Sequence, residues 1–287
     1  MDRDDFDARM AAFEVPAKRF GSVKLNLTAR PLKCGLVALE RYEYLRAAEP
    51  DLVVVGARPG NGKTSFLVQT MLHVARHEGP TMMFSLEMAT SQLLKRAVAA
   101  ESGVPIRHLR NAGAKADAAQ AAIDKAPFFV DDTKGLDINT LRARVLDMHK
   151  RTPLAAVGVD YLQIVRTSGG RSKREEVAEA AEGLKKLAED IQAPVVALAQ
   201  MSRDIEKRQQ LSKTARPTMS DLQECALIEN WADMILFLDG AGKRDPSRAG
   251  QVDVYGAKHR HGEAADFVLF FQGETTRFSD FNEEQGL

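Results

Sequence analysis

The sequence lacks the features of a membrane protein or of a secreted, disulfide-rich protein. Apolar runs such as Leu52–Val55 and Phe267–Phe271 have the length of a strand, whereas a membrane-spanning helix needs about 18 or more apolar residues. The only two cysteines, Cys34 and Cys225, lie far apart and form no metal-ligand spacing. The acidic first residues, MDRDDFD, have no apolar core and are unlike a secretory signal. We therefore expect a protein of the reducing cytoplasm that does not associate with membranes.

The chain also lacks a net charge, because 40 Lys and Arg residues balance 40 Asp and Glu residues. A neutral chain does not attract a polyanion through its bulk charge. The charge is unevenly distributed, however: residues 166–174 hold four basic residues and no acid, and residues 201–219 hold five basic residues and two acids. From the residues alone, both segments are interpreted as solvated surface loops, and a polyanion site is the alternative.

A glycine-rich loop is present between a predicted strand and a predicted helix. The strand is DLVVV at 51–55, the loop is GARPGNG at 56–62, and apolar residues at helical spacing predict a helix over 65–78. Main-chain N–H groups in such a loop and at a helix N-terminus bind phosphate. Lys63 is expected to reach the β- and γ-phosphates of a nucleotide, and the Thr64 hydroxyl to bind Mg²⁺. The residues predicted to bind the nucleotide are Ala57, Arg58, Pro59, Gly60, Asn61, Gly62, Lys63, Thr64 and Ser65.

The loop departs at one position from the strict pattern G-x-x-x-x-G-K-[ST], because Ala57 stands where the pattern has its first glycine. Gly56 and Gly60 are the candidates for making the tight bend instead. A plain strand-to-helix turn is the alternative interpretation, but it would leave the triplet Gly62-Lys63-Thr64 to chance.

Three further predicted strands end in side chains that nucleotide hydrolysis would need. Asp160 follows the run 154–159 and is a candidate second carboxylate for Mg²⁺, with a helix cap as the alternative. Glu87 follows the strand 81–86 and is a candidate base for the attacking water, or else a first-turn glutamate favoured by the helix dipole. Gln200 follows the strand 194–199 and is a candidate sensor of the γ-phosphate, or else a solvated strand-end amide.

Strands and helices alternate along the chain, which predicts an α/β fold with a mostly parallel central sheet and helices on both faces. Ligands of such a sheet bind at the carboxyl ends of its strands. Ser220 and Gln223 are interpreted as a capping box at the start of a late helix. The remaining predicted elements are helices at 90–101, 115–125, 138–150, 174–191 and from about 220, strands at 127–131 and 233–238, and a C-terminal β-hairpin, 251–258 with 264–271.

Seven segments resemble DnaB-type replicative helicases, and they occur in the same order. They are ARPGNGKT, FSLEM, VDYLQ, ALAQMSR, PTMSDLQE, IENWAD, and AKHRHG ahead of LFFQGETTRF, and they cover about residues 50–280. The resemblance implies that residues 21–287 form a RecA-like P-loop ATPase that uses ATP and Mg²⁺ and assembles as a homo-hexameric ring around single-stranded DNA. It assigns Lys63 and Thr64 to the phosphates and Mg²⁺, Glu87 to water activation, Asp160 to Mg²⁺ and Gln200 to sensing the γ-phosphate.

The resemblance further implies that a neighbouring subunit completes each site with a basic pair, which corresponds to Lys258 and Arg260. From the residues alone, two basic residues at a hairpin tip are more often a solvated edge. The same resemblance makes DNA-binding residues of Arg171, Lys173, Arg174, Arg203, Lys207, Arg208, Gln223, Glu224 and Ala226. The family commonly has SDLRESG where this chain has SDLQECA, so that one positive charge per subunit is lost. Binding through phosphates would depend strongly on salt.

The family usually carries a large N-terminal helical domain, whereas only about 50 residues precede the glycine-rich loop here, so we expect that domain to be absent. Phe6, Met10 and Phe13 form one apolar stripe. Residues 1–20 are therefore expected to form a helix that resembles the family's inter-subunit linker helix, with a helix packed on its own domain as the alternative.

The expected function is that of an ATP-dependent replicative DNA helicase motor that translocates on single-stranded DNA and unwinds duplex, with a helicase loader or a primase as further partners. The small size suggests a phage, plasmid or other mobile-element protein. Two alternatives stay open: a RecA-like DNA-binding ATPase of recombination or remodelling that does not unwind DNA, and a truncated module that modulates a larger helicase ring.

Overall fold

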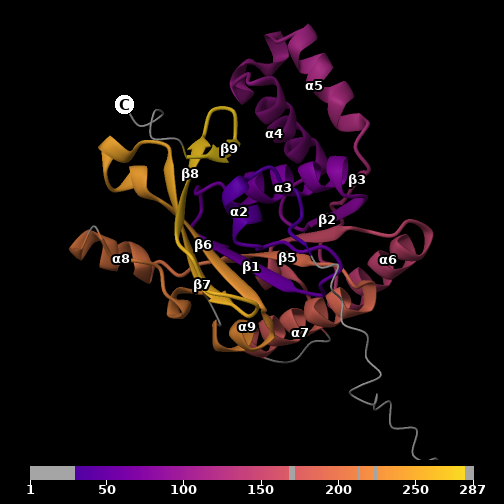
Figure 1. Ribbon diagram of the computed structural model, residues 1–287, viewed down its shortest axis with the longest axis vertical. Helices are drawn as coiled ribbons and strands as arrows, with labels where there is room; N and C mark the ends of the chain where they lie inside the picture. Colours follow the sequence, from indigo (N-terminus) through magenta and orange to yellow (C-terminus); the bar gives the residue numbers. More distant parts are fainter. Residues whose placement is uncertain (1–29, 168–171, 213, 223–224, 282–287) are drawn as a thin grey trace, which may run out of the picture.

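The described part of the chain is built around one nine-stranded sheet (Figure 1). The computed structural model describes residues 30–167, 172–212, 214–222 and 225–281. The helix predicted over residues 1–20 lies outside these ranges. The strands are β1 (Leu52–Ala57), β2 (Thr81–Ser85), β3 (Phe128–Asp131), β4 (Ala156–Asp160), β5 (Val195–Gln200), β6 (Met234–Gly240), β7 (Gln251–His259), β8 (Phe267–Gln272) and β9 (Arg277–Asp280).

The sheet has the strand order β3-β2-β4-β5-β1-β6-β7-β8-β9. All pairs from β3 to β6 are parallel, and the pairs from β6 to β9 are antiparallel. The prediction of a mostly parallel sheet that closes with an antiparallel hairpin is therefore confirmed. Because β1 lies between β5 and β6, the loop that follows β1 emerges near the middle of the sheet, at the carboxyl edge of its parallel part.

Helices cover both faces of the sheet, as predicted (Figure 1). They are α2 (Val37–Arg41), α3 (Lys63–His77), α4 (Thr90–Ser102), α5 (Ala114–Asp124), α6 (Ile138–Arg151), α7 (Lys173–Ile191), α8 (Asp204–Leu211) and α9 (Cys225–Trp231). Strand β1 shows why two layers form. Val53 and Val55 pack with residues of α3 in one core, whereas Leu52 and Val54 pack with residues of α7 in the other. Alternate residues of a buried strand thus supply apolar surface to both helix layers.

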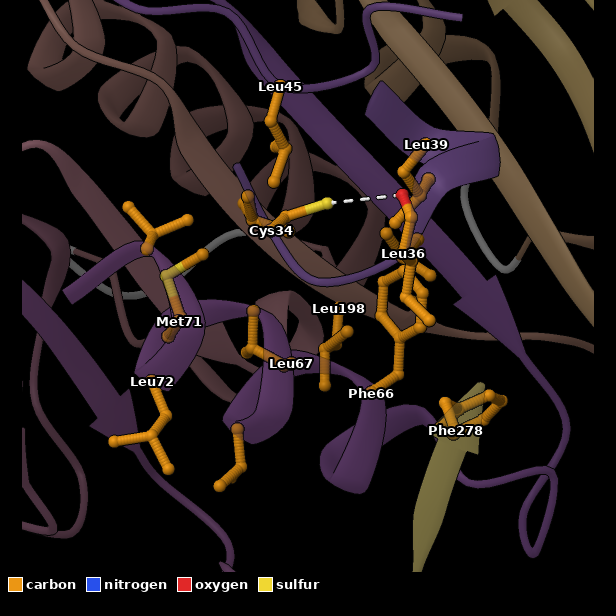
Figure 2. Close-up of a cluster of buried hydrophobic side chains, with 14 of the residues drawn as sticks. Cys34, Leu36, Leu39, Leu45, Phe66, Leu67, Met71, Leu72, Leu198 and Phe278 are labelled. Carbon is orange, nitrogen blue, oxygen red and sulfur yellow. Dashed lines mark hydrogen bonds between the residues drawn. The ribbon is translucent and has the colours of Figure 1, made fainter. Parts of the chain in front are cut away.

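Cys34 lies in the core on the α3 side of the sheet (Figure 2). It is fully buried among leucine, methionine and phenylalanine side chains, and its thiol contacts the carbonyl oxygen of Leu36 at 3.7 Å. Burial raises the pKa of Cys34 to about 12. The side chain is therefore a packing residue, in agreement with its lack of a metal-ligand spacing.

The segment between β5 and β6 differs most from the prediction. Residues 204–211 form helix α8, where a loop was predicted. The late helix begins at Cys225 and not near residue 220. Asp221 explains the difference, because its carboxylate accepts hydrogen bonds from the N–H and hydroxyl of Thr218 at 2.7 and 3.1 Å and fixes residues 219–221 as a short 3-10 turn. The predicted capping box of Ser220 is thus replaced by one that starts two residues earlier, and Gln223 lies outside the described residues.

Strand β9 is a further element that was not predicted; it extends the hairpin by pairing antiparallel with β8. Within the described ranges, no helix is both long enough and apolar enough to cross a membrane.

Candidate nucleotide-binding site

The glycine-rich loop connects the buried strand β1 to the N-terminus of α3. Gly60 and Gly62 have φ values of +80° and +83°, so these two glycines make the bend. A Cβ atom on Gly62 would also lie 2.8 Å from the ring of Phe278. Gly56, by contrast, is a residue of β1, where a Cβ atom would lie 2.8 Å from both Leu222 and Phe237. Among the described residues no side chain caps α3, so its first N–H groups are available to an anion.

Thr64 and Asp160 form a direct contact at the base of this loop. The Thr64 hydroxyl donates to Asp160 Oδ2 at 2.6 Å, while Asp160 Oδ1 is buried without a hydrogen-bond partner among the described residues. Burial raises the pKa of Asp160 above its usual value, although the hydrogen bond from Thr64 opposes the shift. A hydroxyl beside a carboxylate with an unused oxygen is the type of hard oxygen donor set that Mg²⁺ prefers. The residues present therefore fit a magnesium ion.

Lys63 lies next to this pair. Its ammonium is 4.0 Å from the centre of the Tyr161 ring, and Tyr161 directly follows Asp160. Burial lowers the pKa of Lys63, and the charges of Asp160 and Glu87 oppose the shift. The ammonium thus lies between an aromatic face and two carboxylates, where it gives the loop a concentrated positive charge.

Glu87 and Gln200 reach the same end of the sheet from the neighbouring strands. Ser85 of β2 pairs with Asp160 of β4, so Glu87 lies two residues beyond that pair, and it is exposed. Gln200 of β5 pairs with Ala57 of β1, at the point where the loop begins. The structure therefore brings together all five residues that were predicted from strand ends and from the loop.

Gln163 is a site residue that the sequence reasoning missed. It is buried, its Oε1 accepts from the N–H of Gln200 at 3.1 Å, and its Nε2 donates to the Gln200 carbonyl at 3.2 Å. These bonds fix the backbone of Gln200 and leave its own side-chain amide for another partner. The position of Gln163 in the segment VDYLQ was the signal that could have identified it.

The side chain of Arg58 bonds to α8 and not to the interior of the loop. It donates to Glu206 Oε1 and to the Met201 carbonyl, both at 2.8 Å. Lys243, from a turn after β6, donates to the Pro59 carbonyl at 3.3 Å. The outer part of the loop is therefore supported from two sides by groups distant in sequence.

Lys258 and Arg260 lie at the opposite edge of the sheet from the loop. Strand β7 runs antiparallel to β6, and His259 pairs with Met234, the first residue of β6. The basic pair is thus at the amino ends of the parallel strands, and the structure does not bring it to the phosphate loop of the same chain. Arg260 has a side chain that is 66% exposed.

The predicted DNA-binding residues that the structure describes are at the start of α7 and in and around α8. Lys173, Arg174, Arg203 and Lys207 are exposed, and Lys207 pairs with Asp204. Arg208 differs, because its guanidinium makes two bonds, of 2.7 and 2.6 Å, to the buried carboxylate of Asp221, which gives it a structural role in fixing α8. Three of the predicted residues lie outside the described ranges, and the side chain of a fourth is not described; these are Arg171, Gln223 and Glu224, and Ala226, respectively.

The strand order, the phosphate loop after β1 and the two helix layers define a RecA-like P-loop domain. A solved structure of a helicase-type ATPase domain agrees with this assignment, with a TM-score of 0.81 and 25% sequence identity over 98% of this chain and 100% of that one. A second solved structure, of a DnaB-like replicative helicase and its interactions with primase, also has a TM-score of 0.81; at 24% identity over 98% of this chain and 67% of that one, it supports the fold.

The chain belongs to the family of the DnaB-like helicase C-terminal domain, whose family model matches residues 32–280. It is 36% identical to the replicative DNA helicase DnaB of Leifsonia xyli over 80% of its own length, and 34% identical to that of Geobacillus stearothermophilus over 79%. The chain spans about half the length of these relatives, with 52% of each covered.

Proposed function

We propose that this chain is the ATP-driven motor of a replicative DNA helicase, a cytoplasmic protein that hydrolyses ATP between copies of itself in a hexameric ring and moves along single-stranded DNA. The observation that carries the proposal is the contact between Thr64 and Asp160 beside Lys63, together with the position of Arg260 at the other edge of the sheet. One copy then has a phosphate site and, at its opposite edge, an exposed guanidinium that a second copy's site could receive.

Each residue of the site has a role that its geometry supports. Lys63 and the N-terminus of α3 bind the phosphates, and the Thr64 hydroxyl and the Asp160 carboxylate would hold Mg²⁺, which neutralises phosphate charge when it is bound. Glu87 is exposed and anionic, and it accepts a proton from the attacking water at its carboxylate. Gln200, whose backbone is fixed by Gln163, contacts the γ-phosphate through its amide and passes the nucleotide state to the segment that leads into α8.

The DNA site is proposed on the exposed basic residues around α7 and α8. Arg58 offers a direct physical link, because it belongs to the phosphate loop and bonds to Glu206 of α8. A primase partner is proposed because one structural relative is described with primase, and a helicase loader is proposed on the same basis of relationship.

ATP hydrolysis by mixed variants tests the shared site. Lys63→Ala removes the phosphate-binding ammonium and Arg260→Ala removes the trans arginine, so each variant alone should be nearly inactive; an arginine of this kind contributes about 10³- to 10⁵-fold to the rate. In an equal mixture, random assembly pairs an intact cradle with an intact arginine at roughly a quarter of the interfaces. The rate with single-stranded DNA should therefore return to about that fraction of the wild-type rate.

Failure to recover at any mixing ratio would contradict the shared site, as would full turnover by a protein that stays monomeric with Mg-ATP. Unwinding of a forked duplex by the wild type then distinguishes a helicase from a DNA-binding ATPase. Stimulation of hydrolysis by DNA without strand separation would support the ATPase alternative.

A further inference from the structure

A buried carboxylate, Asp233, holds the exposed arginine at the edge of the sheet. Asp233 directly precedes β6, and its side chain is only 2% exposed. Its Oδ1 accepts from Nη1 of Arg260 at 3.0 Å, and its main-chain carbonyl accepts from the N–H of Arg260 at 2.9 Å. Both the backbone and the guanidinium of Arg260 are thus fixed to the same residue.

The other oxygen of Asp233 is used by two different elements. Oδ2 accepts from the N–H of Leu52, the first residue of β1, at 2.9 Å and from Nζ of Lys185 in α7 at 2.7 Å. Burial alone would raise the pKa of Asp233, but the bonds from Lys185 and Leu52 lower it below its usual value. Because Lys185 already neutralises the buried charge, the carboxylate does not need Arg260 as its counter-ion.

The residues on either side of Arg260 are anchored as well. Nζ of Lys258 donates to the carbonyl of Glu229 at 2.7 Å, and the His259 ring contacts the carbonyl of Tyr42 at 2.9 Å. His261 contacts the buried carboxylate of Asp51 at 2.8 Å. Four consecutive side chains are therefore each bonded to a different segment of the fold.

This anchoring has a cost in side-chain entropy that a solvated hairpin tip would not need. It is useful when a group must be presented in one orientation, because a catalytic contact that is displaced by about 1 Å can lose about 10²-fold in rate. Arg260 fits this description: one side of its guanidinium bonds to Asp233, and yet 66% of the side chain remains exposed.

We propose that Asp233 is the positioning residue of Arg260, which it orients toward the nucleotide site of a neighbouring copy. The proposal depends on the function proposed above, in which Arg260 acts in trans. Asp233 does not touch the nucleotide; it acts through the guanidinium that it holds.

The test is the ATPase rate of Asp233→Asn with single-stranded DNA, alone and in mixtures. Alone, the variant should lose about 10- to 100-fold in kcat with little change in KM for ATP, because its own phosphate site is intact. Mixed equally with Lys63→Ala, it should recover to roughly a quarter of the wild-type rate, since its intact cradle then meets a correctly held arginine from the other variant. A subunit damaged by misfolding would not be rescued by its neighbour.

Asp233→Asn mixed with Arg260→Ala is the matched control. Both variants have intact cradles and impaired arginines, so this mixture should stay at or below the rate of Asp233→Asn alone. If Asp233→Asn does not fold, the pair Asp233→Asn/Lys185→Met removes both buried charges together, which is often tolerated, and still leaves Arg260 without its anchor.

Three results would overturn the assignment while leaving the shared site intact. One is full activity of Asp233→Asn alone. Another is a rate above the wild type, which would mean that Asp233 restrains Arg260. The third is no rescue by Lys63→Ala when Arg260→Ala is rescued by the same partner. If Arg260→Ala is itself not rescued, the shared site fails and not only the role of Asp233.

Discussion

Replacing Asp160 with asparagine is expected to stabilise the nucleotide-free protein while it removes the ability to respond to Mg-ATP. Asp160 is fully buried, and its Oδ1 has no hydrogen-bond partner among the described residues. A buried acceptor without a partner costs about 1–3 kcal/mol, and more if it is charged. Asparagine has the same shape, and its amide can keep the contact with the Thr64 hydroxyl, so the main change is the loss of a buried negative charge.

The attraction of Asp160 for Lys63 opposes this gain. Lys63 is partly exposed, and its ammonium also contacts the Tyr161 ring. Solvent screening at such a site limits the lost attraction to about 1 kcal/mol or less. The burial effect is therefore larger, and the expected net gain is about 1–2 kcal/mol. For a domain of this size each kcal/mol shifts Tm by about 2–4 °C, so the variant should melt roughly 2–8 °C above the wild type.

The difference should depend on pH with a definite sign. The folded-state pKa of Asp160 is raised above its unfolded value of about 3.9. The stability contributed by the protonated form is fully present below the unfolded pKa and is lost as pH rises through the folded value. The advantage of the asparagine variant should therefore be larger near pH 7 than near pH 5.

Thermal melting without nucleotide, and with Mg²⁺ plus a non-hydrolysable ATP analogue, measures both effects. Ligand at about 100 times its Kd adds about 2.7 kcal/mol to the wild type, and the variant should gain much less. The order of the two melting temperatures should thus reverse on adding Mg-nucleotide. If the variant melts at or below the wild type near pH 7 without nucleotide, the argument that Asp160 is a destabilising metal ligand is wrong.

Three further predictions concern the fold around the site. Arg208→Ala should cost about 3 kcal/mol in urea unfolding, the lower end of the range for a broken buried pair, because it leaves Asp221 buried without its partner. Gly183→Ala should cost about 1–3 kcal/mol, since a Cβ atom there would lie 2.3 Å from Cγ1 of Ile138 and force α6 and α7 apart. Cys34 should react with a thiol reagent at pH 8 only after unfolding, because it is fully buried and its pKa is raised to about 12.

Each of these has a matched control. Lys207→Ala removes a neighbouring exposed charge and should change stability by no more than about 0.5 kcal/mol; a cost equal to that of Arg208→Ala would contradict the role of Asp221. Ile138→Val combined with Gly183→Ala should recover part of the loss, and an additive loss would refute overpacking. The thiol measurement uses Cys225→Ser, and rapid labelling of that folded variant would show that Cys34 is accessible.

The parallel part of the sheet could be predicted because its strands are buried on both faces. Such strands are continuous apolar runs, and the run at 52–57 is fully buried in the structure, like that at 156–160. Helix α8 could not be predicted in the same way. Among its eight residues only Ile205 is buried, so it has no apolar stripe to detect. The start of α9 is set by Asp221, whose partner Arg208 comes from α8, and a contact of this kind is invisible to local capping rules.

The chemical groups of the site could be predicted for a related reason. Parallel strands end at one edge, so Glu87, Asp160 and Gln200 had to lie near the loop once the strands were assigned. Side-chain partners that come from distant segments could not be found this way. Gln163 and Asp233 are buried amide and carboxylate groups whose role is evident only from the bonds they make in the fold.

The distance between the two edges of the sheet decides how Arg260 can act. Strand β6 has seven residues, which at about 3.3 Å per residue separate its ends by roughly 20 Å. The phosphate loop is at one end, beside the strand that pairs with β6, and Arg260 is at the other. This separation exceeds the length of an arginine side chain, so a single copy cannot complete its own site with Arg260. Any contribution of this arginine to hydrolysis therefore requires a second copy, and the rate per subunit should rise with protein concentration through the range in which the copies assemble.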